Sequence, residues 1–260
     1  MVKEVFYPTS PQILHEMVVS LTVSVQSFVD ENLSVHPKIA LVPNDYYIYS
    51  GAVMASAYSA LSKNKDIKEI IVVGRNSDKS FTGYGVPSFG SIKNILGEKK
   101  VSSRVKQLLD EYKDFHGFDN DEMFSNIDCQ MPFVLSTFNI NSLLPVIVGR
   151  TNKYIKLVNF LSEAIKEKHV AVIISSNISN TQGSGKIIKK DSKQAQAIVQ
   201  NNLRDLPFSG DSSNILLRIF SSVCKKRGYD INPLIYSNSS DFDKDSNISR
   251  GYFSMIGGIG

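Results

Sequence analysis

Residues 44–50 form the part of the sequence best suited to bind a ligand. They include Asn44, Asp45, three tyrosines and Ser50, whose amide, carboxyl and hydroxyl groups can all hydrogen-bond a small molecule. An apolar run precedes them at 39–42, and a small-residue segment with helical spacing follows Gly51. A continuous apolar run of this kind is typical of a strand covered on both faces. The loop therefore lies at the carboxyl end of a buried strand, where open α/β sheets usually place their ligands.

The four histidines do not form a recognisable catalytic or metal-binding set. His15 lies on a predicted helix, His36 precedes Pro37 and His169 leads into a predicted strand, so we interpret these three as surface or structural residues. His116 lies in a polar loop from which it could reach a site. No Ser/His/Asp arrangement, Gly-x-Gly-x-x-Gly sequence or P-loop is visible.

Composition favours a soluble α/β protein. The 260 residues are 42% hydrophobic, enough for a substantial core, and we assign residues 1–260 to a single domain. A net charge of +4 is too mild to imply nucleic acid, and no basic run is interleaved with aromatic residues. Two cysteines do not make a disulfide framework, no signal-peptide pattern opens the chain, and the apolar segment 17–29 is too short to span a bilayer. We therefore expect a cytoplasmic protein with no nucleic-acid or membrane partner.

Strand and helix patterns alternate along the chain and predict a three-layer α/β/α domain with a mostly parallel, mixed sheet. Helices are expected from Pro11 onward, with Ser10 as N-cap, and at 53–61, 101–112, 154–166, 194–203 and 215–227, the last with Gly228 as C-cap. Segment 129–138 is interpreted as a short apolar helix or turn. Buried strands are expected at 39–42, 69–73, 143–148 and 170–174, the first two being parallel within a βαβ unit. Strands at 231–236 and 248–256 should form an antiparallel edge pair.

Several finer expectations follow from the same patterns. The first helix should cover one face of the sheet, and Ser56 and Ser59 should look outward from the second helix. Segments 74–97 and 114–126 lack periodicity, so we interpret both as polar loops, the longer of which would shape a site. The glycine-rich tail at 257–260 has the composition of a low-complexity segment.

The polar loop also carries a family resemblance. Residues 43–51 read Pro-Asn-Asp-Tyr-Tyr-Ile-Tyr-Ser-Gly and resemble the P-H-A-G-Y-x-Y-S-G segment of the Memo family, also called protein B of the AmmeMemoRadiSam system. Other segments resemble the family in the same order along the chain. Residues 6–8 resemble its F-Y-P, 70–74 the strand before its G-P-x-H-H, and 128–133 the end of its E-H-S-L-E-V-Q-L-P-F. Residues 146–149 resemble its V-P-I-x-V-G, 175–180 its S-S-D-L-S-H and 250–252 its V-G-Y. The resemblance implies a fold related to class III extradiol dioxygenases.

In that family, histidine, acid and cysteine side chains gather at a cleft where a metal can bind, and the resemblance places other residues at those positions here. The first His corresponds to Asn44, the His pair to Ser77 and Asp78, and the His of E-H-S to Ser125. The remaining positions fall on Asn177, Asn180 and, for the late Cys-Gly pair, Ser209. With two adjacent acids, the expected cleft is Asn44, Asp45, Ser77, Asp78, Ser125, Asp128, Asn177, Asn180 and Ser209, held by the framework residues Tyr47, Tyr49, Ser50, Gly51, Gly74 and Gln130.

This replacement changes what the cleft can hold. Amide and hydroxyl oxygens are weak donors for iron, copper and zinc, and only Asp45, Asp78 and Asp128 could serve a hard cation such as magnesium. We therefore expect no cofactor and hypothesise a non-catalytic protein that binds a small polar ligand or a protein. The alternative is a metal-dependent oxidoreductase or hydrolase with a rearranged site built from those acids and His116. The resemblance also implies a possible protein partner in a radical-SAM-associated system.

The two cysteines are not expected to supply the missing donors. Cys129 stands where the family has an apolar residue, so we interpret it as a small buried hydrophobic residue rather than a nucleophile. Cys224 lies on the predicted last helix and is interpreted as a core residue.

Overall fold

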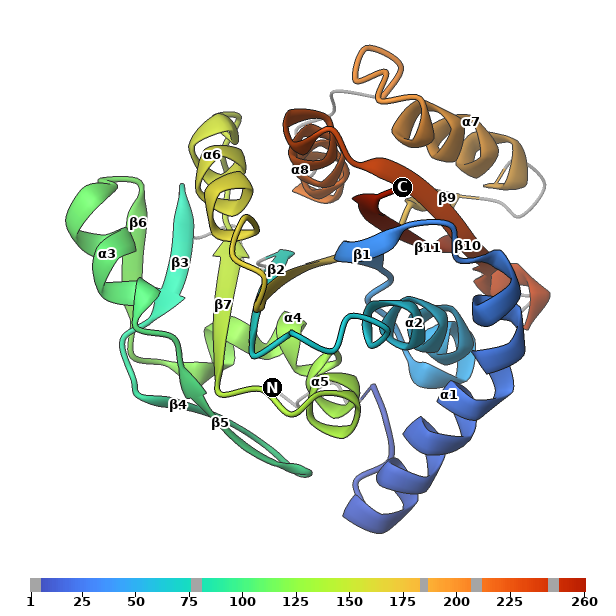
Figure 1. Cartoon of the computed structure of the whole chain (residues 1–260), viewed down its shortest axis with the longest axis horizontal. Helices are drawn as coiled ribbons and strands as arrows, with labels where there is room; N and C mark the ends of the chain where they lie inside the picture. Colours follow the sequence, from blue (N-terminus) through green and yellow to red (C-terminus); the bar gives the residue numbers. More distant parts are fainter. Residues whose placement is uncertain (1–5, 76–80, 183–186, 207–211, 243–247) are drawn as a thin grey trace.

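The computed structural model describes residues 6–75, 81–182, 187–206, 212–242 and 248–260, and these are organised around one mixed sheet (Figure 1). Along the sheet the strands lie in the order β10-β11-β1-β8-β2-β7-β3-β6; β5 joins β4 to β7, and β9 pairs with β11. The strands are β1 (His36–Val42), β2 (Glu69–Arg75), β3 (Tyr84–Pro87), β4 (Ser91–Asn94), β5 (Gly97–Val101), β6 (Phe115–Phe118), β7 (Ser142–Val148), β8 (Val170–Ser175), β9 (Ser179–Gln182), β10 (Asp230–Asn238) and β11 (Ile248–Ile259).

The middle of this sheet is parallel. Strand β8 lies between β1 and β2 and is parallel to both, which confirms the predicted orientation of those two strands. Strand β7 continues the parallel part beside β2. At the other side, β11 is antiparallel to β1 and to β10, so the predicted pairing of the last two strands is confirmed, but only β10 is an edge.

Helices cover both faces of the sheet, and the predicted three-layer α/β/α architecture is confirmed (Figure 1). Alternation along β1 separates the two cores: Ile39 and Leu41 belong to the core under α6, α7 and α8, and Ala40 and Val42 to the core under α2 and α5. The helices are α1 (Pro11–Asn32), α2 (Tyr47–Leu61), α3 (Arg104–Glu111), α4 (Ser125–Asp128), α5 (Met131–Thr137), α6 (Ile155–Ala164), α7 (Ile187–Val199) and α8 (Ser212–Arg227), with 3₁₀ turns at Asp121–Phe124 and Ser239–Asp241.

Helix ends that the sequence marks clearly lie where they were predicted. Ser10 caps α1 by accepting a hydrogen bond from the Ile13 N–H, and Pro11 occupies the first helical position. At the other end of the chain, Gly228 follows α8 with a φ of +65°, a conformation that favours glycine.

Helix α2 differs from the prediction in its start and in its surroundings. It begins at Tyr47 rather than after Gly51, so the loop after β1 is only four residues long. Helix α1 packs on α2 and α5 as an outer layer, and not directly on the sheet as predicted. Ser56 and Ser59 are both buried, contrary to the prediction. The Ser56 hydroxyl lies 2.7 Å from that of Ser254 in β11, and Ser59 donates to Gln26 Oε1 of α1 at 2.9 Å.

Both predicted long loops contain regular structure, so these two predictions were wrong. Described residues of segment 74–97 form β3 and the hairpin strand β4, which turns into β5 at Gly97 with a φ of +147°. Segment 114–126 contains β6, the 3₁₀ turn Asp121–Phe124 and the start of α4. The strands are only four or five residues long, which is too short to show periodicity in the sequence.

The last strand extends into the glycine-rich tail, beyond its predicted end at 256. Gly257 and Gly258 lie in β11 opposite β1, in a closely packed part of the sheet. A Cβ atom at Gly257 would lie 2.5 Å from Cys224 Sγ, and one at Gly258 would lie 1.9 Å from the His36 carbonyl oxygen. The glycines therefore allow α8 and β1 to approach this strand closely.

Within the described ranges, the helices are all too short or too polar to cross a membrane.

Candidate functional site

The family segments at 43–51 and 175–180 meet at the carboxyl ends of β1 and β8. Val42 pairs with Ser175 at the end of these parallel strands, and the chain then continues into Asn44 on one side and Asn177 on the other. The Asn177 Oδ1 accepts a hydrogen bond from the Asn44 backbone N–H at 2.8 Å. The structure thus brings two of the predicted cleft residues into direct contact.

The Asn44 side chain is fully engaged with the protein itself. Its Nδ2 donates to the Asn126 carbonyl at 2.8 Å, and its Oδ1 accepts from the Cys129 thiol, with Sγ at 2.9 Å. Both ends of the amide are therefore occupied, and the backbone amide is bound by Asn177. We call Asn44, Asn126, Cys129 and Asn177 the Asn44 network.

Gln130 holds the chain segments around this network together by hydrogen bonds. Its side chain is completely buried, and its Nε2 donates at 2.9 Å to both the Pro43 carbonyl and Ser175 Oγ. Its Oε1 accepts from the Tyr58 hydroxyl at 2.9 Å. Gln130 is the N-cap residue of α5, and these bonds tie it to both strand ends and to α2. The side chain therefore fixes the geometry of the corner rather than facing a ligand.

The other predicted framework residues also hold the corner together. Tyr47 donates its hydroxyl to the Cys129 carbonyl at 2.7 Å, and Ser50 donates to the Asp45 carbonyl at 3.1 Å. A Cβ atom at Gly51 would lie 2.8 Å from Leu21 of α1, and one at Gly74 would lie 2.9 Å from Ile127 of α4. These two glycines therefore permit close helix contacts. Tyr49 packs against Phe242 with the two rings tilted and their centres 5.7 Å apart.

Asp45 is buried beside the Asn44 network and bound to other parts of the fold. Its Oδ1 accepts from the Tyr46 N–H at 2.8 Å, and its Oδ2 accepts from the Tyr252 hydroxyl at 3.0 Å and from Arg250 at 3.2 Å. Burial and the neighbouring Asp45 carboxylate raise the pKa of Tyr252, so this hydroxyl stays protonated and donates. Asp45 thereby joins β11 to the start of α2.

Asp128 is the last residue of α4. The Tyr7 hydroxyl donates to its Oδ2, and the Asn94 amide donates to its Oδ1 at 2.9 Å. Burial raises the pKa of Tyr7, and the Asp128 carboxylate raises it further, so both partners of the carboxylate are neutral donors. Tyr7 and Asn94 were not predicted as site residues; Tyr7 belongs to the family's F-Y-P segment, which was the available signal.

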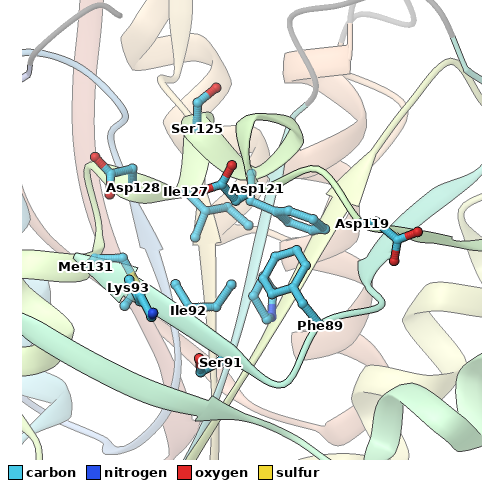
Figure 2. Close-up of a pocket in the computed structure, with 12 residues that line it drawn as sticks. Phe89, Ser91, Ile92, Lys93, Asp119, Asp121, Ser125, Ile127, Asp128 and Met131 are labelled. Carbon is cyan, nitrogen blue, oxygen red and sulfur yellow. The ribbon is translucent and has the colours of Figure 1, made fainter.

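A pocket of about 270 Å³ opens beside Asp128 (Figure 2). Figure 2 shows the side chains of Phe89, Ile92 and Ile127 facing one another across it, while the Ser125 hydroxyl points away from them. The sequence interpretation missed most of this lining because it lies in the segments that were interpreted as loops. The lining residues are Phe89, Ser91, Ile92, Lys93, Asp119, Asp121, Phe124, Ser125, Ile127, Asp128, Met131 and Pro145.

The rest of the predicted cleft is placed only in part. Ser77, Asp78 and Ser209 lie outside the described residues. Asn180 belongs to β9, where its backbone pairs with Arg250 of β11. The structure therefore gathers Asn44 and Asn177 in one network, Ser125 and Asp128 at one pocket, and Asp45 with β11.

His116 lies in a different place from the acids with which the alternative site grouped it. It lines a polar depression of about 240 Å³ with Thr82, Gly83, Asp114, Arg150, Thr151, Asn152 and Lys153. Neither Asp45 nor Asp128 lines that depression. The described geometry gives no support to a joint site for these three side chains.

The described residues at the positions that correspond to the family's metal ligands do not fit a transition metal. No three His, Cys, Asp or Glu side chains in the described part of the chain lie close enough together to hold a metal ion. Burial raises the pKa of the Cys129 thiol, with the Asp128 carboxylate adding to the effect, so the metal-binding thiolate form is disfavoured. What remains in the Asn44 network is amide, carbonyl and thiol groups that satisfy one another, which is poor coordination chemistry for iron, copper or zinc.

Both cysteines are expected to be unreactive in the folded protein. Cys129 and Cys224 are fully buried, as interpreted from the sequence, and burial raises the pKa of each thiol. Because the thiolate is the reacting form, neither should be modified by a disulfide reagent within minutes at pH 8, whereas both should react at once in guanidinium chloride. Counting the thiolate released spectrophotometrically checks this. Rapid modification of the native Cys224→Ser variant would show that Cys129 is an accessible nucleophile.

Comparison with known proteins agrees with the described fold. A family model described as Memo-like protein matches residues 3–256. A MEMO1 family protein of Methanobrevibacter smithii is 26% identical over 241 residues, covering 85% of this chain and 83% of its own, and one of Methanocaldococcus jannaschii is 25% identical over 276 residues, covering 96% and 95%.

A solved structure shares the fold without close sequence similarity. An uncharacterised protein of Escherichia coli K12 superposes with a TM-score of 0.52 at 8% identity, covering 86% of this chain and 100% of its own. The family match extends over nearly the whole length of the chain. The chain therefore belongs to the Memo-like family.

Proposed function

We propose that this chain is a non-catalytic protein of the Memo-like family. It binds a small molecule and does not hold a transition metal. The observation that carries the proposal is the Asn44 side chain, which stands at the family's first histidine position. Both of its polar ends bond to the protein, to Asn126 and to Cys129. A metal at this position would have to displace these bonds and would gain only an amide oxygen, a weak donor.

The energetics favour the closed network over an open coordination site. Cys129 and Gln130 are fully buried and Asn44 is half-buried, so breaking the bonds between them leaves polar atoms without partners. Each unsatisfied buried group costs about 1–3 kcal/mol. The binding role is then supported at the neighbouring pocket of about 270 Å³, which Ser125 and Asp128 border.

Metal content tests this proposal directly. The protein, expressed with iron, copper and zinc supplements and purified without chelator, should contain far less than one of these ions per chain. Stoichiometric metal held by Asn44 or its neighbours would overturn the proposal.

A restored variant provides the matched control. Changing the family positions back, by Asn44→His, Ser77→His, Asp78→His, Ser125→His, Asn177→Asp, Asn180→His and Ser209→Cys, should raise metal content toward one ion per chain, since imidazole, carboxylate and thiolate donors return. Equal metal content in the native chain and this variant would show that the substitutions do not govern metal binding. A cytoplasmic location and a protein partner in a radical-SAM-associated system stay predictions from the sequence.

A further inference from the structure

The pocket beside Asp128 combines an apolar interior with a charged rim. Its interior is formed by Phe89, Ile92 and Ile127, which face one another in Figure 2, together with Phe124, Met131 and Pro145. Phe89 and Phe124 meet edge to face, with ring centres 5.8 Å apart. Such walls offer a ligand apolar contact area and a ring to stack on. At about 270 Å³ the space is smaller than the roughly 300–1,000 Å³ of drug-sized ligand sites and suits a molecule with one ring.

The charges around this pocket favour a cation. The pocket is lined by three carboxylates, those of Asp119, Asp121 and Asp128, and by one ammonium, that of Lys93. Asp119 and Asp121 are exposed at the rim, and the hydrogen bonds to Asp128 come from the neutral groups of Tyr7 and Asn94, which leave its negative charge in place. A positively charged ligand would therefore be attracted to the opening, and a negatively charged one repelled.

The same acids do not form a metal site. In the described part of the chain no three His, Cys, Asp or Glu side chains come together closely enough to coordinate an ion, and these three are no exception. A bare cation would also leave the aromatic and aliphatic walls without contact. An organic cation satisfies both features, because its apolar body fills the interior while its charge stays at the wet rim.

We propose that the pocket bounded by Phe89, Ile92, Ile127 and the rim acids binds a small organic amine that carries a single aromatic or branched apolar group. This inference rests on the proposed binding role and names its ligand class. The amine lies toward the exposed rim acids Asp119 and Asp121, and the apolar group packs against Phe89 and Ile92.

Three probes of matched size separate charge from shape. Phenethylamine, 2-phenylethanol and 3-phenylpropionate are titrated into ¹⁵N-labelled protein at pH 7 and followed by amide chemical shifts. Phenethylamine should bind most tightly and shift the amides of residues 89–94 and 125–131, and its affinity should fall with added salt while that of the alcohol stays constant. Equal or tighter binding of 3-phenylpropionate, or no shifts in these segments with any probe, would overturn the inference.

Two variants show which residues attract the charge of the ligand and which accommodate its apolar group. Replacing Asp119 and Asp121 together by Asn should weaken phenethylamine about threefold to tenfold and leave 2-phenylethanol unchanged, whereas the exposed Asp66→Asn should change neither. Ile92→Phe should abolish binding of all three probes by filling the interior, with folding confirmed by its amide spectrum. An unchanged preference for the amine in the double variant would remove the assigned role of the acids.

These outcomes are distinguishable from those of the metal experiment. The inference fails if the probes bind without preference for the cation, even when the chain contains no metal. The proposed function fails if the chain holds stoichiometric iron, copper or zinc, whatever the probes do.

Discussion

Gln130→Met is expected to lower the free energy of unfolding by about 3–5 kcal/mol, since it leaves the Pro43 carbonyl, Ser175 Oγ and the Tyr58 hydroxyl without their partner. Methionine preserves the length and nearly the volume of the side chain, so the loss is one of hydrogen bonding and not of packing. Because Gln130 is completely buried, water cannot replace the amide. Urea denaturation followed by circular dichroism measures the change.

The control for this substitution is Gln107→Met on α3. Gln107 is exposed, and its side chain bonds to Glu111 one turn away, so the same chemical change should alter the free energy of unfolding by less than about 0.5 kcal/mol. A Gln130→Met variant as stable as the Gln107→Met variant would show that the corner beneath Asn44 does not depend on this amide. A loss of the predicted size should lower the melting temperature by about 10 °C.

Asp45→Asn is expected to destabilise the protein by about 2–4 kcal/mol. The buried carboxylate accepts from Tyr46, Tyr252 and Arg250, and an amide of the same shape can accept through only one of its two terminal atoms. The negative charge also lies just before the N-terminus of α2, where it interacts favourably with the helix dipole. Arg250 is 43% exposed, so the ion pair itself contributes only a small part of the loss.

A double-mutant cycle distinguishes this structural role from a catalytic one. Tyr252→Phe alone should lower the free energy of unfolding by about 1–2 kcal/mol. The double variant should lose less than the sum of the two single losses, because both substitutions remove the same hydrogen bond. Asp66→Asn, at an exposed position, serves as the control. If Asp45→Asn were as stable as the native chain, Asp45 would be free for chemistry and the interpretation of it as a structural residue would fail.

The elements best predicted from the sequence are those with a strong local signal. The buried strands β1, β7 and β8 follow from continuous apolar runs, and α1 and α8 follow from helical spacing with Ser10 and Gly228 at their ends. The family segments predicted the meeting of Asn44 with Asn177, because both follow the ends of neighbouring parallel strands.

What the sequence could not predict depends on contacts between distant segments. Ser56 and Ser59 have the polarity of exposed residues, but α1 and β11 cover them and supply hydroxyl and amide partners. Strand β4 is too short for a period-2 pattern, and its hairpin with β5 creates the wall that carries Ile92. Single-sequence periodicity contains no information about either contact.

The most direct test of the central claim is anomalous diffraction from crystals soaked in ferrous, cupric and zinc salts. Data at the three absorption edges should show no metal peak within bonding distance of Asn44, Asn177 or Cys129, and the Asn44 amide should still donate to the Asn126 carbonyl. An ordered iron, copper or zinc ion coordinated by any of these three side chains would contradict the account.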